Sequence, residues 1–326
     1  MGVEVLPILQ GLDPLAPYCF TDVSPSPTLR CEEPFYITLS DCYRQRLESL
    51  TESATRSHQR VSPSDILKFW WEVPSLQTQE AVVRHLDRET AKIDALIDKQ
   101  DQLIATLRED RTATITQAVT KGLDPKADLK DSGEEWLGQV PAHWAVSKLS
   151  WHASCNSGNS TIGMEIHADQ TNDLHVKVVG GNGTMGYTSN GFIDSEILAV
   201  GRVGALCGNV HEVTPPAWIT DNALILQIRN GFELKYLASA LRSRQLNDIA
   251  SKTAQPLITG KQVLDQRLPR PPIEEQRAIV ERIEEHSRKV NSLIARSTEM
   301  IETLREYRSA LITNAVTGKI NVREAL

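Results

Sequence analysis

The sequence predicts an α+β fold, in which a mixed α/β domain is flanked by two long helices that pair as an antiparallel coiled coil. Two observations lead to this prediction. One helical segment occurs twice in the chain, and strand-like apolar runs lie between its two copies. The predicted regions, in order, are an N-terminal region at 1–72, a first helix at 73–122, a linker at 123–139, a globular domain at 140–270, and a second helix with a C-terminal tail at 271–326.

The repeat determines this architecture. Residues 74–120 match residues 271–317 without a gap, at an offset of 276 − 79 = 197. The run Thr-Leu-Arg-Glu at 106–109, for example, returns at 303–306. Beyond its opening prolines neither copy contains Gly or Pro, so each is expected to form one continuous helix. A helix of about 47 residues spans on the order of 70 Å, which suits a spacer better than a core element.

Boundary residues support both helix ends. Pro74 and Pro271 stand at or just before the first turn, where a missing N–H is tolerated, and acidic residues follow soon after, which suits the helix dipole. Gly122 and Gly318 follow the last apolar positions, where a left-handed residue commonly closes a helix.

Apolar residues recur at heptad spacing along both copies and predict a coiled-coil seam. Polar Gln100 and Ser297 interrupt the seam at equivalent positions, as a register-fixing pair would. An ordinary dimerisation coil would explain the heptads, but not the same helix on both sides of a globular segment. The predicted seam residues are Leu86, Ile93, Leu96, Leu103, Leu107, Ile283, Val290, Leu293, Met300, Leu304 and Leu311.

The central segment has a mixed α/β pattern. Residues 123–139 are rich in Gly, Pro and Asp, which favours an extended linker. Strands are expected at Leu174–Val179, Ile197–Val203 and Ala223–Ile228, because β-branched and aliphatic residues dominate there. A helix at Phe232–Leu246 should follow them.

Composition excludes several classes of protein. No stretch approaches eighteen apolar residues and no signal peptide is apparent, so we expect a cytoplasmic protein that does not engage a membrane. The five cysteines form no CxxC or CxxH pattern, which indicates reduced thiols and no metal site. The net charge of −7 does not suggest a general nucleic-acid binder, although residues 140–270 carry 11 Lys and Arg against 10 Asp and Glu, a net of +1.

Two polar loops are candidates for ligand contacts. The glycine-rich run at 180–187 lacks the Lys-Ser/Thr of a phosphate-binding P-loop, and alone it indicates a tight turn. With the run at 201–205 it nevertheless presents polar groups suited to base edges or phosphates. The polar run at 251–256 is either a comparable site or a plain exposed loop. The candidate DNA-contacting residues are Asn182, Thr184, Tyr187, Arg202, Lys252 and Gln255.

Catalysis has little support in the sequence. It contains no Asn-Pro-Pro-Phe/Tyr run of an amino-methyltransferase, no Walker sequence and no nuclease-like Asp…Glu-x-Lys cluster. We therefore expect no catalytic residues, and a free-standing enzyme is the least favoured class.

Several short motifs stand in a characteristic order along the chain. They are Val-Thr-Lys-Gly-Leu-Asp-Pro at 119–125, Asp-Ser-Gly at 131–133, Glu-Trp-Leu-Gly at 135–138, Pro-Ala-His-Trp at 141–144, Gly-Gly-Asn-Gly at 180–183, Gly-Arg-Val-Gly at 201–204, Thr-Ala-Gln-Pro at 253–256, Pro-Pro-Ile-Glu-Glu-Gln-Arg at 271–277, Leu-Arg-Glu-Tyr-Arg at 304–308 and Ala-Val-Thr-Gly-Lys-Ile at 315–320. With this order the chain resembles one known family, the specificity subunits of Type I restriction-modification enzymes, and the resemblance covers about residues 35 to 326.

The resemblance implies a division of roles. Residues 140–270 would be a target recognition domain that reads part of a bipartite sequence in double-stranded DNA. The two helices would fix the spacing and dock methyltransferase (M) subunits, through which restriction and translocase (R) subunits join. The complex would use S-adenosylmethionine, ATP and Mg²⁺ in its other subunits, with none bound directly by this chain.

One departure from the family pattern raises an alternative. Members carry two complete recognition domains, whereas residues 1–72 resemble only a remnant of the first. We therefore expect an N-terminally truncated form, which could restore a two-part target by forming a homodimer. The alternative is a truncated assembly or coiled-coil scaffold protein that recognises no sequence.

Overall fold

The computed structural model describes residues 32–49, 52–53, 59–60, 74–251 and 255–320. These residues divide into two compact units, each considered by itself. One is Thr106–Ser292, and the other combines Met1–Ala105 with Leu293–Leu326.

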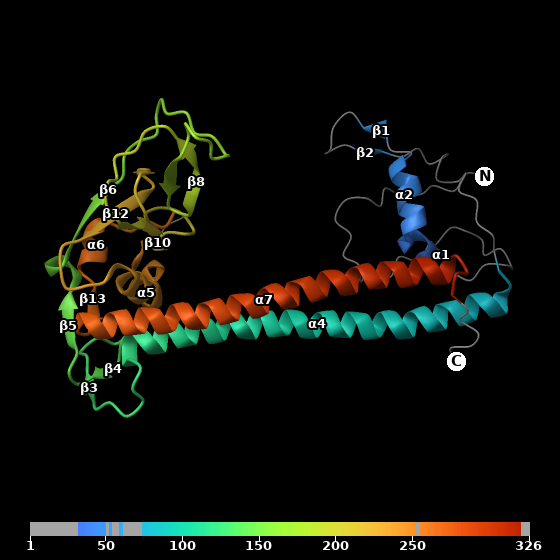
Figure 1. Cartoon of the computed structure of the whole chain (residues 1–326), viewed down its shortest axis with the longest axis horizontal. Helices are drawn as coiled ribbons and strands as arrows, with labels where there is room; N and C mark the ends of the chain where they lie inside the picture. The colour runs from blue at the N-terminus through green and yellow to red at the C-terminus, as the bar shows by residue number, and fades with distance from the viewer. Residues whose placement is uncertain (1–31, 50–51, 54–58, 61–73, 252–254, 321–326) are drawn as a thin grey trace. The chain divides into compact units, whose positions relative to one another are not determined.

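Both predicted long helices are present. Helix α4 spans Leu76–Lys121 and helix α7 spans Ile273–Val316, each uninterrupted (Figure 1). Gly122 follows α4 with φ +75°, and Gly318 follows α7 with φ +69°. Both glycines therefore adopt the left-handed conformation expected of a helix cap, and the predicted ends are confirmed.

The two helices pair antiparallel in each unit. In the unit that contains the chain termini, Arg308 Nε lies 3.0 Å from Asp94 Oδ1, while Leu86, earlier in α4, belongs to a cluster with Ile312, later in α7. In the other unit, His286 Nε2 lies 3.0 Å from Asp110 Oδ2. Val119, later in α4, shares a cluster there with residues near the start of α7. The predicted antiparallel coiled coil is confirmed.

The structure corrects four of the predicted seam positions. An isoleucine follows each of the four directly and is buried or half-buried in its place. The second line of the seam thus follows the first by four residues instead of three. Residues three and four positions after a seam residue lie on its two flanks. Both positions are apolar here, so heptad spacing alone could not decide which of the two faces the partner helix. The exposed residues are Leu96, Leu103, Leu293 and Met300.

The other predicted seam positions are buried or half-buried. Leu86, Ile93, Ile283 and Val290 are buried, and Leu107, Leu304 and Leu311 are half-buried. Ser297 is buried as expected, whereas Gln100 is half-buried.

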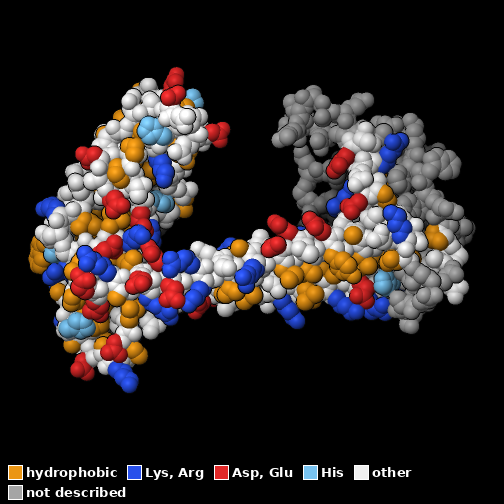
Figure 2. Space-filling view, viewed as in Figure 1, with side chains coloured by type: hydrophobic (Ala, Val, Ile, Leu, Met, Phe, Trp, Pro, Cys, Tyr) orange, Lys and Arg blue, Asp and Glu red, His pale blue; other side chains and the backbone are white. Residues whose placement is uncertain are grey.

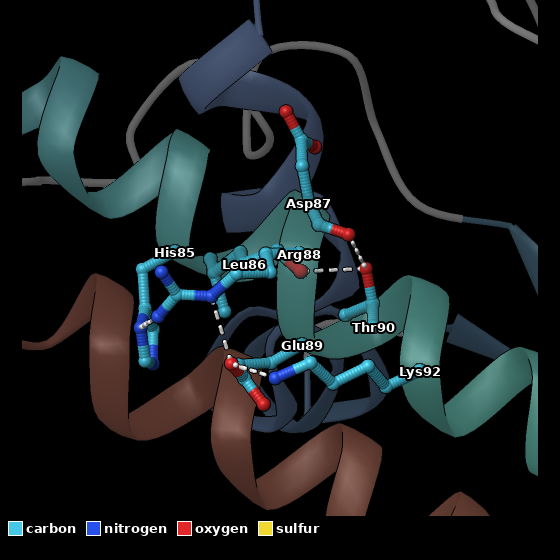
Figure 3. A network of polar contacts seen from close by, with 7 residues as sticks. All are labelled: His85, Leu86, Asp87, Arg88, Glu89, Thr90 and Lys92. Atoms are coloured by element: carbon cyan, nitrogen blue, oxygen red, sulfur yellow. Dashed lines mark hydrogen bonds and ion pairs between the residues drawn. The ribbon is translucent and has the colours of Figure 1, made fainter. Parts of the chain in front are cut away.

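A second buried polar residue, Thr90, also lies on the seam line. Its hydroxyl donates to the carbonyl oxygen of Leu86 at 2.7 Å, so the helix itself satisfies this polar group (Figure 3). The neighbouring exposed face carries local ion pairs, in which Glu89 accepts from Arg88 at 3.0 Å and from Lys92 at 2.9 Å. Hydrogen bonds from Lys92 and Arg88 lower the pKa of Glu89, as expected for a carboxylate between two cations.

The globular domain between the helices contains two main sheets. The first is antiparallel in the order β10-β9-β12-β6, with β6 at Ala153–Ser157, β9 at Ile197–Gly201, β10 at Val210–Val213 and β12 at Ala223–Ile228. The second has the order β11-β7-β8, with β7 at Val176–Gly180, β8 at Gly183–Thr188 and β11 at Ala217–Ile219. Strand β11 runs parallel to β7, and β8 antiparallel to it.

Strand β9 connects two cores because both its faces are buried. Leu198 and Val200 belong to a large cluster with helix α5, Leu234–Arg244, and the adjoining ends of α4 and α7. Ile197 and Ala199 point the other way, into a cluster with Val179 of the second sheet. This alternation is the period of two expected of a strand. The three predicted strands and the predicted helix are therefore confirmed. Strand β12 has the predicted bounds, β9 and α5 are shorter, and β7 begins and ends slightly later than predicted.

Three smaller pairs of strands complete the described residues. Strand β5, Ala145–Lys148, pairs with β13, Arg267–Arg270. Strand β3, Leu129–Asp131, lies in the predicted linker and pairs with β4, Gln139–Pro141, which begins at the last residue of that linker. A 3-10 turn at Leu149–Trp151, a second at Leu246–Ile249 and helix α6, Gly260–Leu264, connect the strands. The N-terminal region contains α1, Glu32–Leu39, α2, Asp41–Ser49, β1, Glu52–Ser53, and β2, Gln59–Arg60.

Three polar contacts join the globular domain to its helices. The fully buried amide of Gln276 accepts from the backbone N–H of Glu233 at 2.8 Å and donates to the carbonyl oxygen of Gly231 at 3.0 Å. Trp144 Nε1 donates to Glu275 Oε1 at 3.0 Å. The buried hydroxyl of Tyr236 lies 3.2 Å from the carbonyl oxygens of Val119 and Pro269. Burial raises the pKa of Tyr236 well above its usual value, so its hydroxyl remains a donor.

Among the described helices, none combines the length and the apolar character that crossing a membrane requires.

We predict that Tyr236→Phe lowers the free energy of unfolding by about 1–2 kcal/mol, because two buried carbonyl oxygens lose their shared donor. Chemical denaturation measures the change. Tyr307→Phe is the matched control, since Tyr307 is 59% exposed, and it should leave stability unaltered. Equal stabilities of Tyr236→Phe and the unsubstituted chain would show that this hydroxyl does not hold the domain to its helices.

Candidate nucleic-acid interface

A two-residue hairpin turn, Gly181-Asn182, joins β7 to β8 and lies against the end of β9. Gly180 pairs with Gly183 across this turn. A Cβ atom on Gly201 would lie 2.6 Å from the carbonyl oxygen of Gly181, and one on Gly181 would lie 3.0 Å from the carbonyl oxygen of Asn222. Glycine at both positions allows the two backbones to approach this closely. The predicted loops at 180–187 and 201–205 are therefore brought together here.

Arg202 follows β9 directly, and its side chain reaches the end of β6. Its Nη1 donates to Ser157 Oγ at 3.1 Å, and its backbone N–H donates to the carbonyl oxygen of Asn222 at 2.9 Å. No carboxylate in the described part of the chain forms an ion pair with its guanidinium. A hydroxyl neutralises no charge, so Arg202 keeps its full positive charge for a ligand.

The described end of the polar run, from Gln255 onward, borders Arg202. The backbone N–H of Ile258 donates to the carbonyl oxygen of Arg202 at 2.9 Å, and that of Gly204 donates to the carbonyl oxygen of Pro256 at 2.9 Å. Gln255 is exposed next to Pro256. Lys252, the other candidate in this run, lies outside the described residues. Asn182, Arg202 and Gln255 thus belong to segments that meet at one edge of the domain.

Thr184 and Tyr187 lie in strand β8, whereas the sequence placed them in a loop. The tight turn at Gly181-Asn182 ends sooner than the glycine-rich composition suggested, so the chain pairs again from Gly183 onward. Tyr187 lies opposite Lys177 of β7 in the register. Residues directly opposite each other in an antiparallel pair share one face of the sheet.

Lys177 is a candidate that the sequence reasoning missed. It is the exposed residue in the otherwise buried strand β7, and it makes no hydrogen bond or ion pair with any described residue. The signal was present in the run Val-Lys-Val-Val at 176–179, where one charged residue interrupts an apolar strand. A single lysine on an exposed sheet face is common, so the sequence alone did not distinguish it.

Four other cations of the domain form ion pairs. On the face that Figure 2 shows, Lys and Arg are interspersed with Asp and Glu instead of forming a uniform basic face. The ion pairs are Lys148 with Asp265, Lys235 with Glu284, Arg242 with Glu212, and Arg267 with Glu134. Three other arginines, Arg229, Arg244 and Arg270, donate to uncharged oxygens instead.

The described cysteines are free thiols. Burial raises the pKa of Cys155 to about 11, so its thiol stays protonated and unreactive near neutral pH. No cluster of three or more His, Cys, Asp or Glu suited to a metal ion occurs among the residues that the structure describes.

Comparisons with known proteins all point to one family. Residues 185–303 match the family model described as Type I restriction modification DNA specificity domain. The specificity subunit of Type I restriction enzyme EcoprrI from Escherichia coli is 35% identical over 133 residues, which cover 38% of this chain and 33% of that protein. The EcoKI specificity subunit from Escherichia coli strain K12 is 21% identical over 305 residues, covering 82% and 62%. The chain thus spans less than two thirds of the length of either relative.

Two solved structures share the fold. A chain from a study of complex assembly and conformational transition of the type I restriction-modification system superposes with a TM-score of 0.70 at 18% identity, covering 88% of this chain and 70% of that one. The HsdS subunit from Thermoanaerobacter tengcongensis gives 0.52 at 19% identity, covering 90% and 71%. With the family match over residues 185–303 and the curated relatives, these findings show that the chain contains a region matching the Type I restriction modification DNA specificity domain and is similar to Type I specificity subunits.

Proposed function

We propose that this chain recognises DNA for a Type I restriction-modification complex and has no catalytic role of its own. In this proposal the globular domain binds one part of a bipartite target in double-stranded DNA. The main support is that three segments meet at one exposed edge: the Gly181-Asn182 turn, Arg202 and the segment at Gln255. Amide and guanidinium groups are thereby brought together. Such groups form bidentate hydrogen bonds with adenine and guanine edges.

We further propose that α4 and α7 dock M subunits and, through them, R subunits. The predicted seam residues that are exposed in the structure support this, because they give the helix pair an apolar surface. These residues and Tyr307 are 44% to 59% exposed, and we refer to them together as the apolar stripe: Leu96, Leu103, Leu293, Met300 and Tyr307. Figure 2 shows hydrophobic side chains exposed along these helices. Leu96 and Leu293 are equivalent in the repeat, as are Leu103 and Met300, so the antiparallel pairing puts them on one flank. Contiguous exposed apolar surface of this kind marks interaction sites.

S-adenosylmethionine, ATP and Mg²⁺ belong to the other subunits in this proposal. The chain's own residues would position the DNA and the partners, and the chemistry would occur on those partners.

The second candidate is an assembly or scaffold protein that docks partners without recognising a sequence. The small net charge of residues 140–270 favours it, because tight DNA binding usually needs several clustered cations. Sequencing of modified adenines in cells with and without this chain, each expressing the same M subunit, separates the two functions. DNA recognition predicts that a bipartite methylated motif disappears when the chain is removed. An unchanged methylome would contradict it.

We predict that Arg202→Ala lowers affinity for a duplex carrying the methylated motif about tenfold or more, since a good bidentate contact with guanine is worth about 1–3 kcal/mol. Fluorescence anisotropy with motif and scrambled duplexes measures the loss. Arg277→Ala is the control, because Arg277 is exposed and forms an ion pair within α7. Unchanged affinity and specificity of Arg202→Ala would remove Arg202 from the interface.

We predict that Leu293→Ser together with Met300→Ser abolishes co-purification of the M subunit, because polar hydroxyls replace two large apolar contacts. The helices should remain folded, since both side chains are about half exposed, and circular dichroism checks this. Leu123→Ser is the matched control, as Leu123 is 44% exposed outside the apolar stripe. Retention of the M subunit at the unsubstituted stoichiometry would show that docking uses another surface.

A further inference from the structure

A cavity of about 300 Å³ lies on the globular domain beside the Gly181-Asn182 turn. Strands β7, β8 and β10 and helix α5 contribute its walls. The polar groups that line it are Lys177, Thr184, His211, Glu212, Thr214 and Arg242.

The charges in the cavity favour an anion. Arg242 donates from Nε to the carbonyl oxygen of Val210 at 3.1 Å and from Nη1 to Glu212 Oε1 at 3.0 Å, so its guanidinium is held in place and paired. Lys177 has no partner among the described residues. Two cations therefore face one carboxylate, which leaves a net charge of +1 apart from His211.

The uncharged groups suit an oxygen-rich ligand. The Thr184 hydroxyl is exposed and makes no hydrogen bond with any described residue, so it can donate to a ligand. Tyr187 shares the sheet face with Lys177, because the two residues lie opposite each other in the register. A flexible ammonium beside a hydroxyl is a pairing typical of phosphate contacts, whereas base edges are better matched by planar groups.

His211, which lines the cavity, also contacts the turn that carries Asn182. A Cβ atom on Gly183 would lie 3.4 Å from the His211 ring, and His211 Nε2 lies 3.4 Å from the carbonyl oxygen of Gly181. A phosphate held at Lys177 would therefore lie next to the turn at a fixed place. Phosphate contacts of this kind set the register in which neighbouring groups meet the bases.

We propose that Lys177 and Thr184 form a seat for one backbone phosphate of the DNA, with Arg242 and its Glu212 partner as the rigid wall. The proposal rests on the proposed function and adds to it a sequence-independent contact that positions the duplex. Arg202 acts at the neighbouring edge, where it contacts bases.

Salt-dependent binding of the whole chain to a 30-base-pair duplex of mixed sequence tests the seat. Lys177→Ala should bind several-fold more weakly to every duplex tried, and the slope of log affinity against log salt should fall by about one. Lys177→Arg should restore most of the slope, because it keeps the charge. Lys130→Ala is the control, since Lys130 is an exposed lysine of β3 away from the cavity.

The outcomes distinguish two kinds of failure. If the unsubstituted chain binds the duplex and Lys177→Ala binds with the same affinity and slope, the seat is wrong and the proposed function stands. An equal loss for Lys130→Ala would also overturn the seat, because the effect would then be one of general charge. If the unsubstituted chain binds no duplex even at low salt, the proposed function and the seat fall together.

Discussion

One buried amide, that of Gln276, is the contact on which the placement of the globular domain depends. It accepts from the N–H that opens α5 and donates to the carbonyl oxygens of Gly231 and Pro271, so the domain and the start of α7 share one satisfied group. Removing the amide would leave buried backbone groups without partners, which is costly. The equivalent Gln79, also fully buried, donates to Pro74 at 2.8 Å. The repeat thus preserves the bond from this glutamine to the proline five residues before it.

The long helices could be predicted fully because their sequence signals are local. The repeat, the prolines and the closing glycines are local signals, and each has a direct structural meaning. Which apolar flank of each helix is buried depends on which isoleucines pack against each other across the helix pair. That is decided by tertiary packing and not by local sequence. Leu96 and Ile97 are neighbours in sequence, yet only their packing shows which one faces the partner helix.

The candidate interface was predictable in part for the same reason. The glycines at 181 and 201 marked a place of close approach, but sequence could not show that they approach each other. Strand β8 was missed because Gly183 and Gly186 suggested a loop, whereas pairing with β7 forms a strand there. Lys177 could be recognised as a candidate only in the structure, where it lines a cavity together with residues of β10 and α5.

In the proposed function, the edge near Asn182 and Arg202 is the DNA-contacting surface, and the β3 and β4 pair of strands lies outside it. Hydrogen–deuterium exchange of the whole chain, with and without duplex DNA, measures this most directly. We expect slower exchange at residues 181–187 and 201–209 on addition of DNA, with residues 129–141 unchanged. Protection confined to 129–141 or to the long helices, with none at the two loops, would contradict it.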